Sequence, residues 1–201
     1  MKESDLYEPI MKFLRDEYNC FYCCQEAGKH GIGSVDVFGV RYKNPKKSEI
    51  ETIGVEVKPY KNAICANFGQ AKGYSLFCDK VYFAFPRFEI TEDDKEAANR
   101  LGIGLIKIEG EKPNFVCKEV LEAPTSVPID KLRSYVLGSK RIYQCESCKV
   151  FQHCKNITKV TDKIWSSTKK EIKNGKGLRV RNKDKKEFYC NTCAKMKLSI
   201  S

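Results

Sequence analysis

The sequence contains no long hydrophobic run, and no stretch approaches the roughly 18 apolar residues that a helix needs to cross a bilayer. Its first residues lack the apolar core of a signal peptide. The glycine-rich stretch 27–34 lacks the full P-loop signature of a nucleotide site, and we see no internal repeat. These absences predict an intracellular, cytoplasmic protein that has no membrane partner.

Acidic residues are scarce in the last third of the chain. Residues 1–130 carry 18 Lys or Arg and 21 Asp or Glu, a formal charge of −3, whereas residues 131–201 carry 19 and 5, a formal charge of +14. A strongly basic segment beside a nearly neutral one indicates a polyanionic partner such as DNA. A lysine-rich surface that is only solvated is the alternative.

The composition is typical of a soluble globular protein, with 201 residues of which 41% are hydrophobic and 31% charged. This length allows one substantial core and a small second module. A proline-bearing stretch around residues 122–128 marks the boundary between them. We therefore expect an α/β domain over residues 1–122, a linker with a short helix over 123–138, and a basic module over 139–201.

Cysteine is abundant, with 11 residues, but an odd number in an intracellular protein argues against a disulfide framework. Six cysteines lie among apolar residues, and we interpret them as small buried hydrophobic side chains. They are Cys20, Cys23, Cys24, Cys65, Cys78 and Cys117. The remaining five lie near the C-terminus and follow a different pattern.

Periodic segments predict alternating helices and strands in the first domain. The expected helices span residues 4–17, 62–78 and 91–102, and the expected strands span 19–25, 35–42, 50–58, 80–86 and 103–108. A helix, a three-stranded meander and then alternating helices and strands predict an α/β core with a mixed sheet.

The most informative stretch is Ile53–Lys58, taken together with Val35–Phe38. A strand directs alternate side chains to opposite faces, so Glu56 and Lys58 share one face while the valines face the core. Pairing of the two stretches as a hairpin would bring Asp36 to the same end. Two carboxylates that close together repel each other unless a cation lies between them, and oxygen ligands suit Mg²⁺ or Mn²⁺.

Asp36 and the tripeptide Glu56-Val57-Lys58, with Gln70 in the following helix, resemble the motif of the PD-(D/E)xK nuclease superfamily. Glu8, in the expected first helix, resembles the acidic residue that several branches supply from that helix, such as the archaeal Holliday-junction resolvases and the Mrr-like restriction enzymes. The resemblance covers about residues 1–110 and implies the restriction-endonuclease-like αβββαβ fold. The sequence departs from the motif at Val35, where the motif has a proline that is often lost in the superfamily.

The resemblance implies a Mg²⁺-dependent endodeoxyribonuclease that hydrolyses phosphodiester bonds. The catalytic set that it implies is Glu8, Asp36, Glu56, Lys58 and Gln70. Asp36, Glu56 and the Val57 carbonyl would hold Mg²⁺ or Mn²⁺, and Lys58 would orient or help deprotonate the attacking water. Because double-strand cleavage usually requires two active sites, a homodimer is a candidate assembly.

Several alternatives remain open at this stage, and one is that the basic tail docks onto another protein or an RNA. Glu8 is also an ordinary carboxylate near a helix start, where the macrodipole favours it. Gln70 is also an exposed helical glutamine. The whole chain is alternatively a nucleic-acid-binding protein that keeps the nuclease fold without turnover.

Two C-x-x-C pairs occur in the basic module, Cys145/Cys148 and Cys190/Cys193, separated by 41 residues. Four thiolates in such pairs are the ligand set of a structural Zn²⁺. The module therefore resembles a zinc ribbon with a long insertion, and His153 or Cys154 could replace one ligand. The insertion is rich in Lys and Arg, which indicates a surface that grips phosphates without reading bases.

Overall fold

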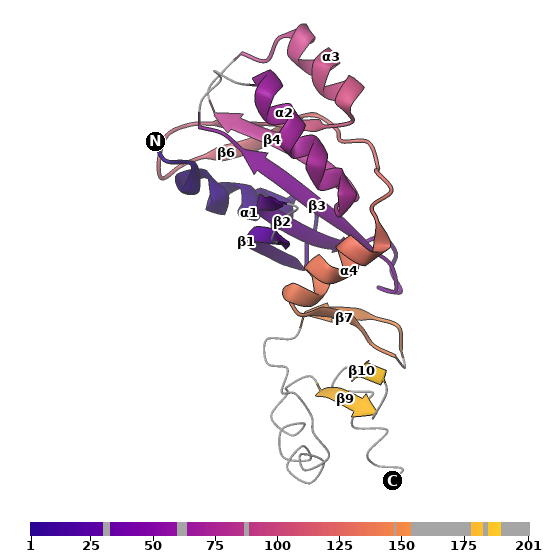
Figure 1. Cartoon of the computed structure of the whole chain (residues 1–201). Coiled ribbons are helices and arrows are strands. Elements are labelled where there is room, and N and C mark those ends of the chain that lie inside the picture. The colour runs from indigo at the N-terminus through magenta and orange to yellow at the C-terminus, as the bar shows by residue number, and fades with distance from the viewer. Residues whose placement is uncertain are drawn as a thin grey trace. The chain divides into compact units, whose positions relative to one another are not determined.

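The computed structural model describes residues 1–29, 33–59, 64–86, 89–146, 148–153, 178–182 and 185–189 (Figure 1). Its helices are η1 (Glu3–Leu6), α1 (Tyr7–Asp16), α2 (Ile64–Gly73), η2 (Tyr74–Leu76), α3 (Glu92–Leu101) and α4 (Asp130–Ser139). Its strands are β1 (Tyr22–Lys29), β2 (Gly33–Tyr42), β3 (Ile50–Val57), β4 (Lys80–Pro86), β5 (Gly104–Glu109), β6 (Val116–Leu121), β7 (Ile142–Gln144), β8 (Phe151–His153), β9 (Leu178–Asn182) and β10 (Lys185–Tyr189). No helix in these ranges is long and apolar enough to span a membrane.

The chain forms two compact units. The first comprises Met1–Tyr42 and Glu51–Val136, and the second comprises Lys43–Ile50 and Leu137–Ser201. The turn between β2 and β3 thus belongs to the second unit, where the Lys47 carbonyl accepts the Phe151 N–H at 3.0 Å.

A six-stranded mixed sheet forms the centre of the first unit, with its strands in chain order from β1 to β6. β1 and β2 are antiparallel, β3, β4 and β5 are parallel, and β5 and β6 are antiparallel again. The predicted α/β class and mixed sheet are therefore confirmed. The edge strand β6 was not predicted, because its alternation of exposed and half-buried positions leaves only a weak hydrophobic pattern.

Helices cover both faces of this sheet (Figure 1). Ile10 and Leu14 of α1 pack with Tyr82 of β4 in the core on one face. On the other face Phe68 of α2 meets Phe83 edge to face, with the ring centroids 5.3 Å apart. Neighbouring residues of β4 thus serve opposite faces, as strand geometry requires.

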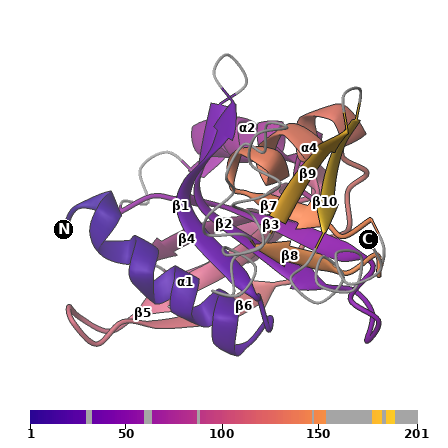
Figure 2. The same cartoon turned by 90° about the horizontal axis from the view of Figure 1, so that it is seen from below.

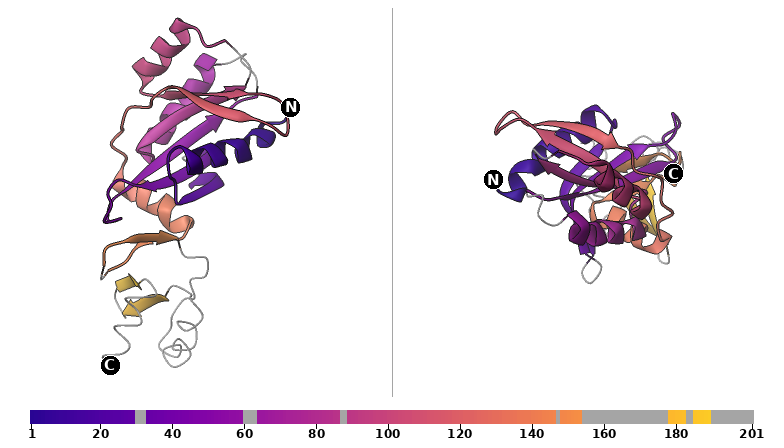
Figure 3. Two further views of the ribbon diagram at one scale, coloured as in Figure 1. Left: turned by 180° about the vertical axis from the view of Figure 1, so that it is seen from behind. Right: turned by 90° about the horizontal axis from the view of Figure 1, so that it is seen from above.

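The turned views confirm this layering. Figure 2 shows α1 and α2 on opposite sides of the sheet, and Figure 3 shows β6 running beside α1, in agreement with their contacts. α3 packs beside α2 and over β5. Thr91 caps α3 by accepting the Asp94 N–H, and Gly102 ends the helix in the left-handed region with φ of 68°.

Every residue of β3 and β4 is buried, which is expected of central strands that are covered on both faces. Thr52 satisfies its polar groups with Asp79, whose carboxylate accepts the Thr52 N–H and O–H at 2.7 Å each. Glu51 pairs with Arg41 at 2.5 Å. Glu56 is the remaining buried polar residue of β3, and its partners define the candidate site.

The second unit contains two short antiparallel hairpins among its described residues, β7–β8 and β9–β10. β10 contacts β7. Cys145 directly follows β7, and Cys190 directly follows β10 in the sequence.

Gly54 in β3 gives a test of the packing between the sheet and the segment after η2. A Cβ at this position would lie 2.9 Å from Cys78 Sγ and 3.2 Å from Val35 Cγ1. We expect Gly54→Ala to lower the free energy of unfolding by about 1–3 kcal/mol, because this core has no room for another methyl group. Urea unfolding measures the change.

Gly73→Ala is the matched control. A Cβ at Gly73 meets nothing within 4 Å among the described residues, and its φ of −57° suits alanine. We expect it to be neutral or to stabilise by up to about 1 kcal/mol. Equal losses in the two variants would contradict the packing argument.

Candidate functional site

Asp36, Glu56 and Lys58 converge at the carboxyl end of β3. Lys58 Nζ lies 2.6 Å from Glu56 Oε1, which places both side chains on one face of the strand. Asp36 Oδ2 accepts the Val57 N–H at 2.7 Å, so the aspartate of β2 is held directly beside the Glu56-Val57-Lys58 tripeptide. Glu56 is fully buried, whereas Lys58 is partly exposed. The structure therefore places the Lys58 amine against the Glu56 carboxylate and the Asp36 carboxylate beside the same tripeptide.

Gln70 reaches this cluster through a neighbouring tyrosine. The Tyr74 hydroxyl donates to Glu56 Oε2, and Gln70 Nε2 donates to the Tyr74 oxygen at 2.9 Å. The same hydroxyl lies 2.9 Å from the Ser34 carbonyl oxygen. The residues lie four apart where α2 continues into η2, so they occupy one face of that segment. Gln70 therefore orients Tyr74, and Tyr74 orients the Glu56 carboxylate.

A second acidic side chain enters from the beginning of the chain. Glu3 Oε2 lies 3.2 Å from Lys58 Nζ, and Glu3 Oε1 accepts the Tyr7 hydroxyl at 3.1 Å. The Tyr7 oxygen is also 3.4 Å from Asp36 Oδ1, so its single proton can serve either carboxylate. Glu3 and Tyr7 thus link η1 and α1 to the two strands that carry the motif.

Glu8 does not join this cluster. Its carboxylate pairs with Arg15 at 3.0 Å, and 67% of its side chain is exposed. It lines a separate hollow of about 620 Å³ between α1 and the segment 112–116. The acid that the first helical segment directs toward Lys58 is Glu3, which lies in the preceding η1 turn.

The carboxylates influence one another strongly. Burial raises the pKa of Asp36 to about 7, aided by the charges of Glu56 and Glu3 and opposed by the Val57 N–H and by Lys58. Burial alone would lower the pKa of Lys58, but its contacts with Glu56, Asp36 and Glu3 raise it above its ordinary value. Burial and then the Glu56 carboxylate raise the pKa of Tyr74, so this hydroxyl remains a donor.

The donor set fits a hard divalent cation. Glu56 Oε1 has no well-directed hydrogen bond among the described residues, although Lys58 Nζ lies near it. The Lys58 N–H donates to the Ala84 carbonyl in β4, and a trans peptide points its C=O away from its N–H. The Val57 carbonyl is therefore directed away from β4, toward the strand that carries Asp36.

No group of three or more His, Cys, Asp or Glu side chains in the described ranges is arranged to hold a metal by itself. A cation here would have Asp36, Glu56 and the Val57 carbonyl as protein ligands and would complete its shell with water. Mg²⁺ commonly retains several waters in this way.

Sequence reasoning missed Glu3, Tyr7 and Tyr74. The spacing of Tyr74, four residues after Gln70, was a usable signal because such pairs share a helix face. Glu3 and Tyr7 carried no such signal, because their approach to Asp36 and Lys58 depends on how α1 lies across the sheet.

The structure describes only part of the expected zinc site. Cys145 is buried, and Cys148 is exposed at the turn of the β7–β8 hairpin. The Cys145 N–H donates to the Val150 carbonyl at 2.9 Å, which closes the turn that carries both thiols. His153 is half-buried at the end of β8. Cys154, Cys190 and Cys193 lie outside the described residues.

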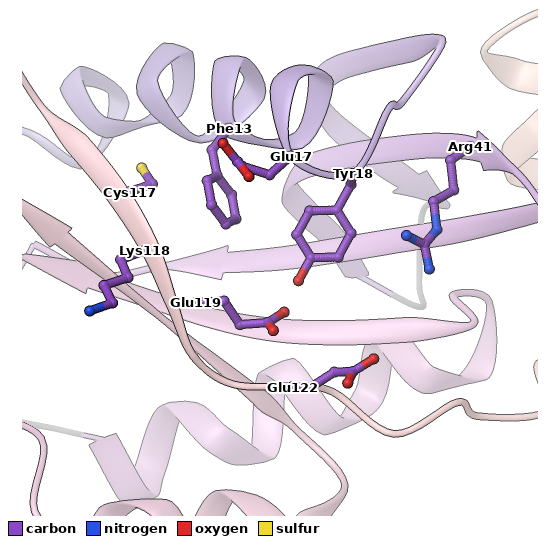
Figure 4. A pocket seen from close by; sticks show the side chains of 8 residues that line it. All are labelled: Phe13, Glu17, Tyr18, Arg41, Cys117, Lys118, Glu119 and Glu122. Carbon is purple, nitrogen blue, oxygen red and sulfur yellow. The ribbon is translucent and has the colours of Figure 1, made fainter.

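Another hollow, of about 520 Å³, lies between α1 and β6 and is lined by none of the predicted site residues (Figure 4). Some of its polar groups are paired. The Tyr18 hydroxyl donates to Tyr82 at 2.7 Å, and Tyr82 donates to Glu119 at 2.8 Å. Arg41 pairs with Glu51 and lies over the Tyr18 ring. Burial and then the charge of Glu122 raise the pKa of Glu119, so this hollow also contains carboxylates that repel each other.

A scan against protein-family models finds no match for this chain, and a search of curated proteins finds none either. Among solved structures the chain is similar to the SPO1766 protein of unknown function from Silicibacter pomeroyi, with 20% sequence identity and a TM-score of 0.46. The likeness covers 69% of this chain and 82% of that chain.

The raised pKa of Asp36 predicts a pH-dependent stability difference. In the absence of divalent metal, the protonated form favours folding below pH 4, and this contribution is lost as pH rises from 4 to about 7. Asp36→Asn has no titrating carboxyl group at this position, but its amide oxygen can still accept the Val57 N–H. We expect the free energy of unfolding of Asp36→Asn to equal that of the native chain near pH 4. At pH 8 it should exceed the native value by about 1–2 kcal/mol, after allowance for solvent screening.

Urea unfolding in EDTA across this pH range measures the difference. Added Mn²⁺ should make the native chain more stable than Asp36→Asn at pH 8. A ligand that binds the native site stabilises only the chain that retains the carboxylate. A stability difference that does not vary with pH would rule out the unfavourable ionisation of Asp36.

Proposed function

We propose that this protein is a metal-dependent DNA endonuclease of the PD-(D/E)xK type, with a restriction-endonuclease-like core. The observation that carries the proposal is the convergence of Asp36, Glu56 and Lys58 at the end of β3. Two carboxylates from adjacent strands and one amine are the groups needed to hold a cation and stabilise an attacked phosphate.

Asp36, Glu56 and the Val57 carbonyl would hold the metal. A bound Mg²⁺ supplies Lewis-acid polarisation of a phosphoryl oxygen and a more acidic water. A divalent cation would also favour the ionised form of Asp36, whose pKa is raised by burial and by the charges of Glu56 and Glu3. Tyr74 fixes the orientation of the Glu56 carboxylate by donating to its second oxygen.

Lys58 would act as a cation in this site. Its contacts with three carboxylates raise its pKa, so the ammonium form predominates at neutral pH. A protonated lysine cannot accept a proton from water, but it can orient the water and stabilise negative charge that develops on the phosphate. We therefore assign Lys58 to charge stabilisation and water orientation.

The second unit would bind the nucleic acid. The charge of +14 over residues 131–201 would favour contacts with phosphates. Cys145 and Cys190 directly follow β7 and β10, and these two strands contact each other. We propose that Cys145, Cys148, Cys190 and Cys193 hold one structural Zn²⁺ that joins the two hairpins.

Cleavage of plasmid DNA in Mg²⁺ or Mn²⁺ tests the catalytic assignment. We expect Asp36→Ala, Glu56→Gln and Lys58→Ala to reduce the rate by at least about 100-fold, because each removes a group that holds the metal or the developing charge. Tyr74→Phe should reduce it less, because it affects only the orientation of Glu56. Circular dichroism establishes that each variant is folded.

Glu8→Gln is the matched control, since this exposed carboxylate pairs with Arg15 outside the cluster. It should cleave at the native rate. Undiminished cleavage by Asp36→Ala and Lys58→Ala would overturn the assignment. Mn²⁺ binding without cleavage of duplex, branched or single-stranded DNA would favour a nuclease-fold binding protein without turnover.

Metal analysis of the purified chain tests the proposed zinc site. We expect one zinc per chain, and we expect Cys145→Ser or Cys190→Ser to lower the zinc content and the free energy of unfolding of the second unit. Cys78→Ser is the control, because Cys78 is buried in the first unit and should leave the zinc content unchanged. A zinc-free native protein would exclude this site.

A further inference from the structure

Cys20 and Cys23 form a C-x-x-C pair in the first unit, separate from the candidate active site. Cys20 ends the connection after α1, where its N–H donates to the Leu14 carbonyl at 3.1 Å. Cys23 lies in β1 and packs against the core cluster that contains Cys20. Neither has a role in the proposed DNA cleavage.

Gly39 leaves room for the Cys20 sulfur on the side of β2 that faces Cys23. It is the cross-strand partner of Cys23 in β2, and a Cβ at Gly39 would lie 3.1 Å from Cys20 Sγ. Directly paired residues of an antiparallel ladder have their Cβ positions about 5 Å apart. The absent side chain of Gly39 thus leaves the space in which the Cys20 sulfur lies next to Cys23.

The two thiols differ in exposure and in electrostatic surroundings. Cys20 is 7% exposed, whereas Cys23 is half-buried and within reach of solvent. The hydrogen bond from Cys20 and then the charge of Arg15 lower the pKa of Cys23, although burial and the nearby Glu8 oppose this effect. Cys117 is also half-buried, and burial raises its pKa to about 12.

We propose that Cys20 and Cys23 are a redox-active dithiol that closes to an intramolecular disulfide when it meets a small disulfide such as oxidised glutathione. The Cys23 thiolate attacks one sulfur of glutathione disulfide, forms a mixed disulfide and releases one glutathione thiolate. Cys20 then loses its proton to solvent and displaces the second glutathione. The protein dithiol is oxidised by two electrons, and one glutathione disulfide is reduced to two glutathione molecules.

The geometry assigns a different role to each cysteine. Cys23 is the exposed nucleophile, and Arg15, which is held by Glu8 at 3.0 Å, supports its thiolate. Cys20 is too buried to meet an external disulfide, but it lies beside Cys23 and can resolve the mixed disulfide. Cys24 is adjacent in sequence, yet strand alternation directs it to the opposite face of β1.

Mass spectrometry of the full-length chain tests the proposal. The reduced protein is incubated with oxidised glutathione, remaining thiols are alkylated, and trypsin releases residues 16–29 by cleavage after Arg15 and Lys29. We expect this peptide to lose two hydrogen atoms and to contain a Cys20–Cys23 disulfide. Thiols of the second unit do not affect this readout, because they lie on other peptides.

Three variants separate the two roles. Cys20→Ser should stop at a stable glutathione adduct on Cys23, because the resolving thiol is absent. Cys23→Ser should react at Cys20 at least about tenfold more slowly than native Cys23. Cys24→Ser, the matched control, should form the native disulfide. A glutathione adduct on Cys24, or equal reactivity of the native chain and Cys23→Ser, would overturn the proposal.

Discussion

The buried carboxylate of Glu56 at the end of β3 constrains the rest of the candidate site. An unpaired ionised carboxylate in a protein interior costs several kcal/mol, so its position requires partners. Lys58 supplies the charge and Tyr74 supplies a hydrogen bond from the segment that follows α2. Tyr74 also lies beside the Ser34 carbonyl of β2. The same contacts therefore join β2, β3 and the helical layer, and they hold the group that the proposed chemistry uses.

An excess of negative charge remains after these contacts are formed. Glu3, Asp36 and Glu56 lie around the ammonium of Lys58, and burial together with the charges of Glu56 and Glu3 raises the pKa of Asp36. Such a site stores electrostatic repulsion that a divalent cation would remove.

The first and second units carry net charges of opposite sign, which is consistent with separate roles in binding and cleavage. The first concentrates carboxylates at one end of its sheet, whereas residues 131–201 carry most of the positive charge. A carboxylate site repels DNA in the absence of metal, so a basic segment would supply the attraction that brings the polyanion to the protein. Under the proposed function, binding and bond cleavage would therefore depend on different parts of the chain.

The sequence alone determined the features that depend on local order. Apolar periodicity located α1 and β4, Thr91 and Gly102 marked the ends of α3, and alternation put Glu56 and Lys58 on one face. Only the tertiary structure decided that Glu3 rather than Glu8 approaches Lys58, that Tyr74 connects Gln70 to Glu56, and that Cys20 meets Cys23 over Gly39. The physical reason is that periodicity sets the direction of a side chain within its own element, whereas these contacts depend on how separate elements are packed against one another.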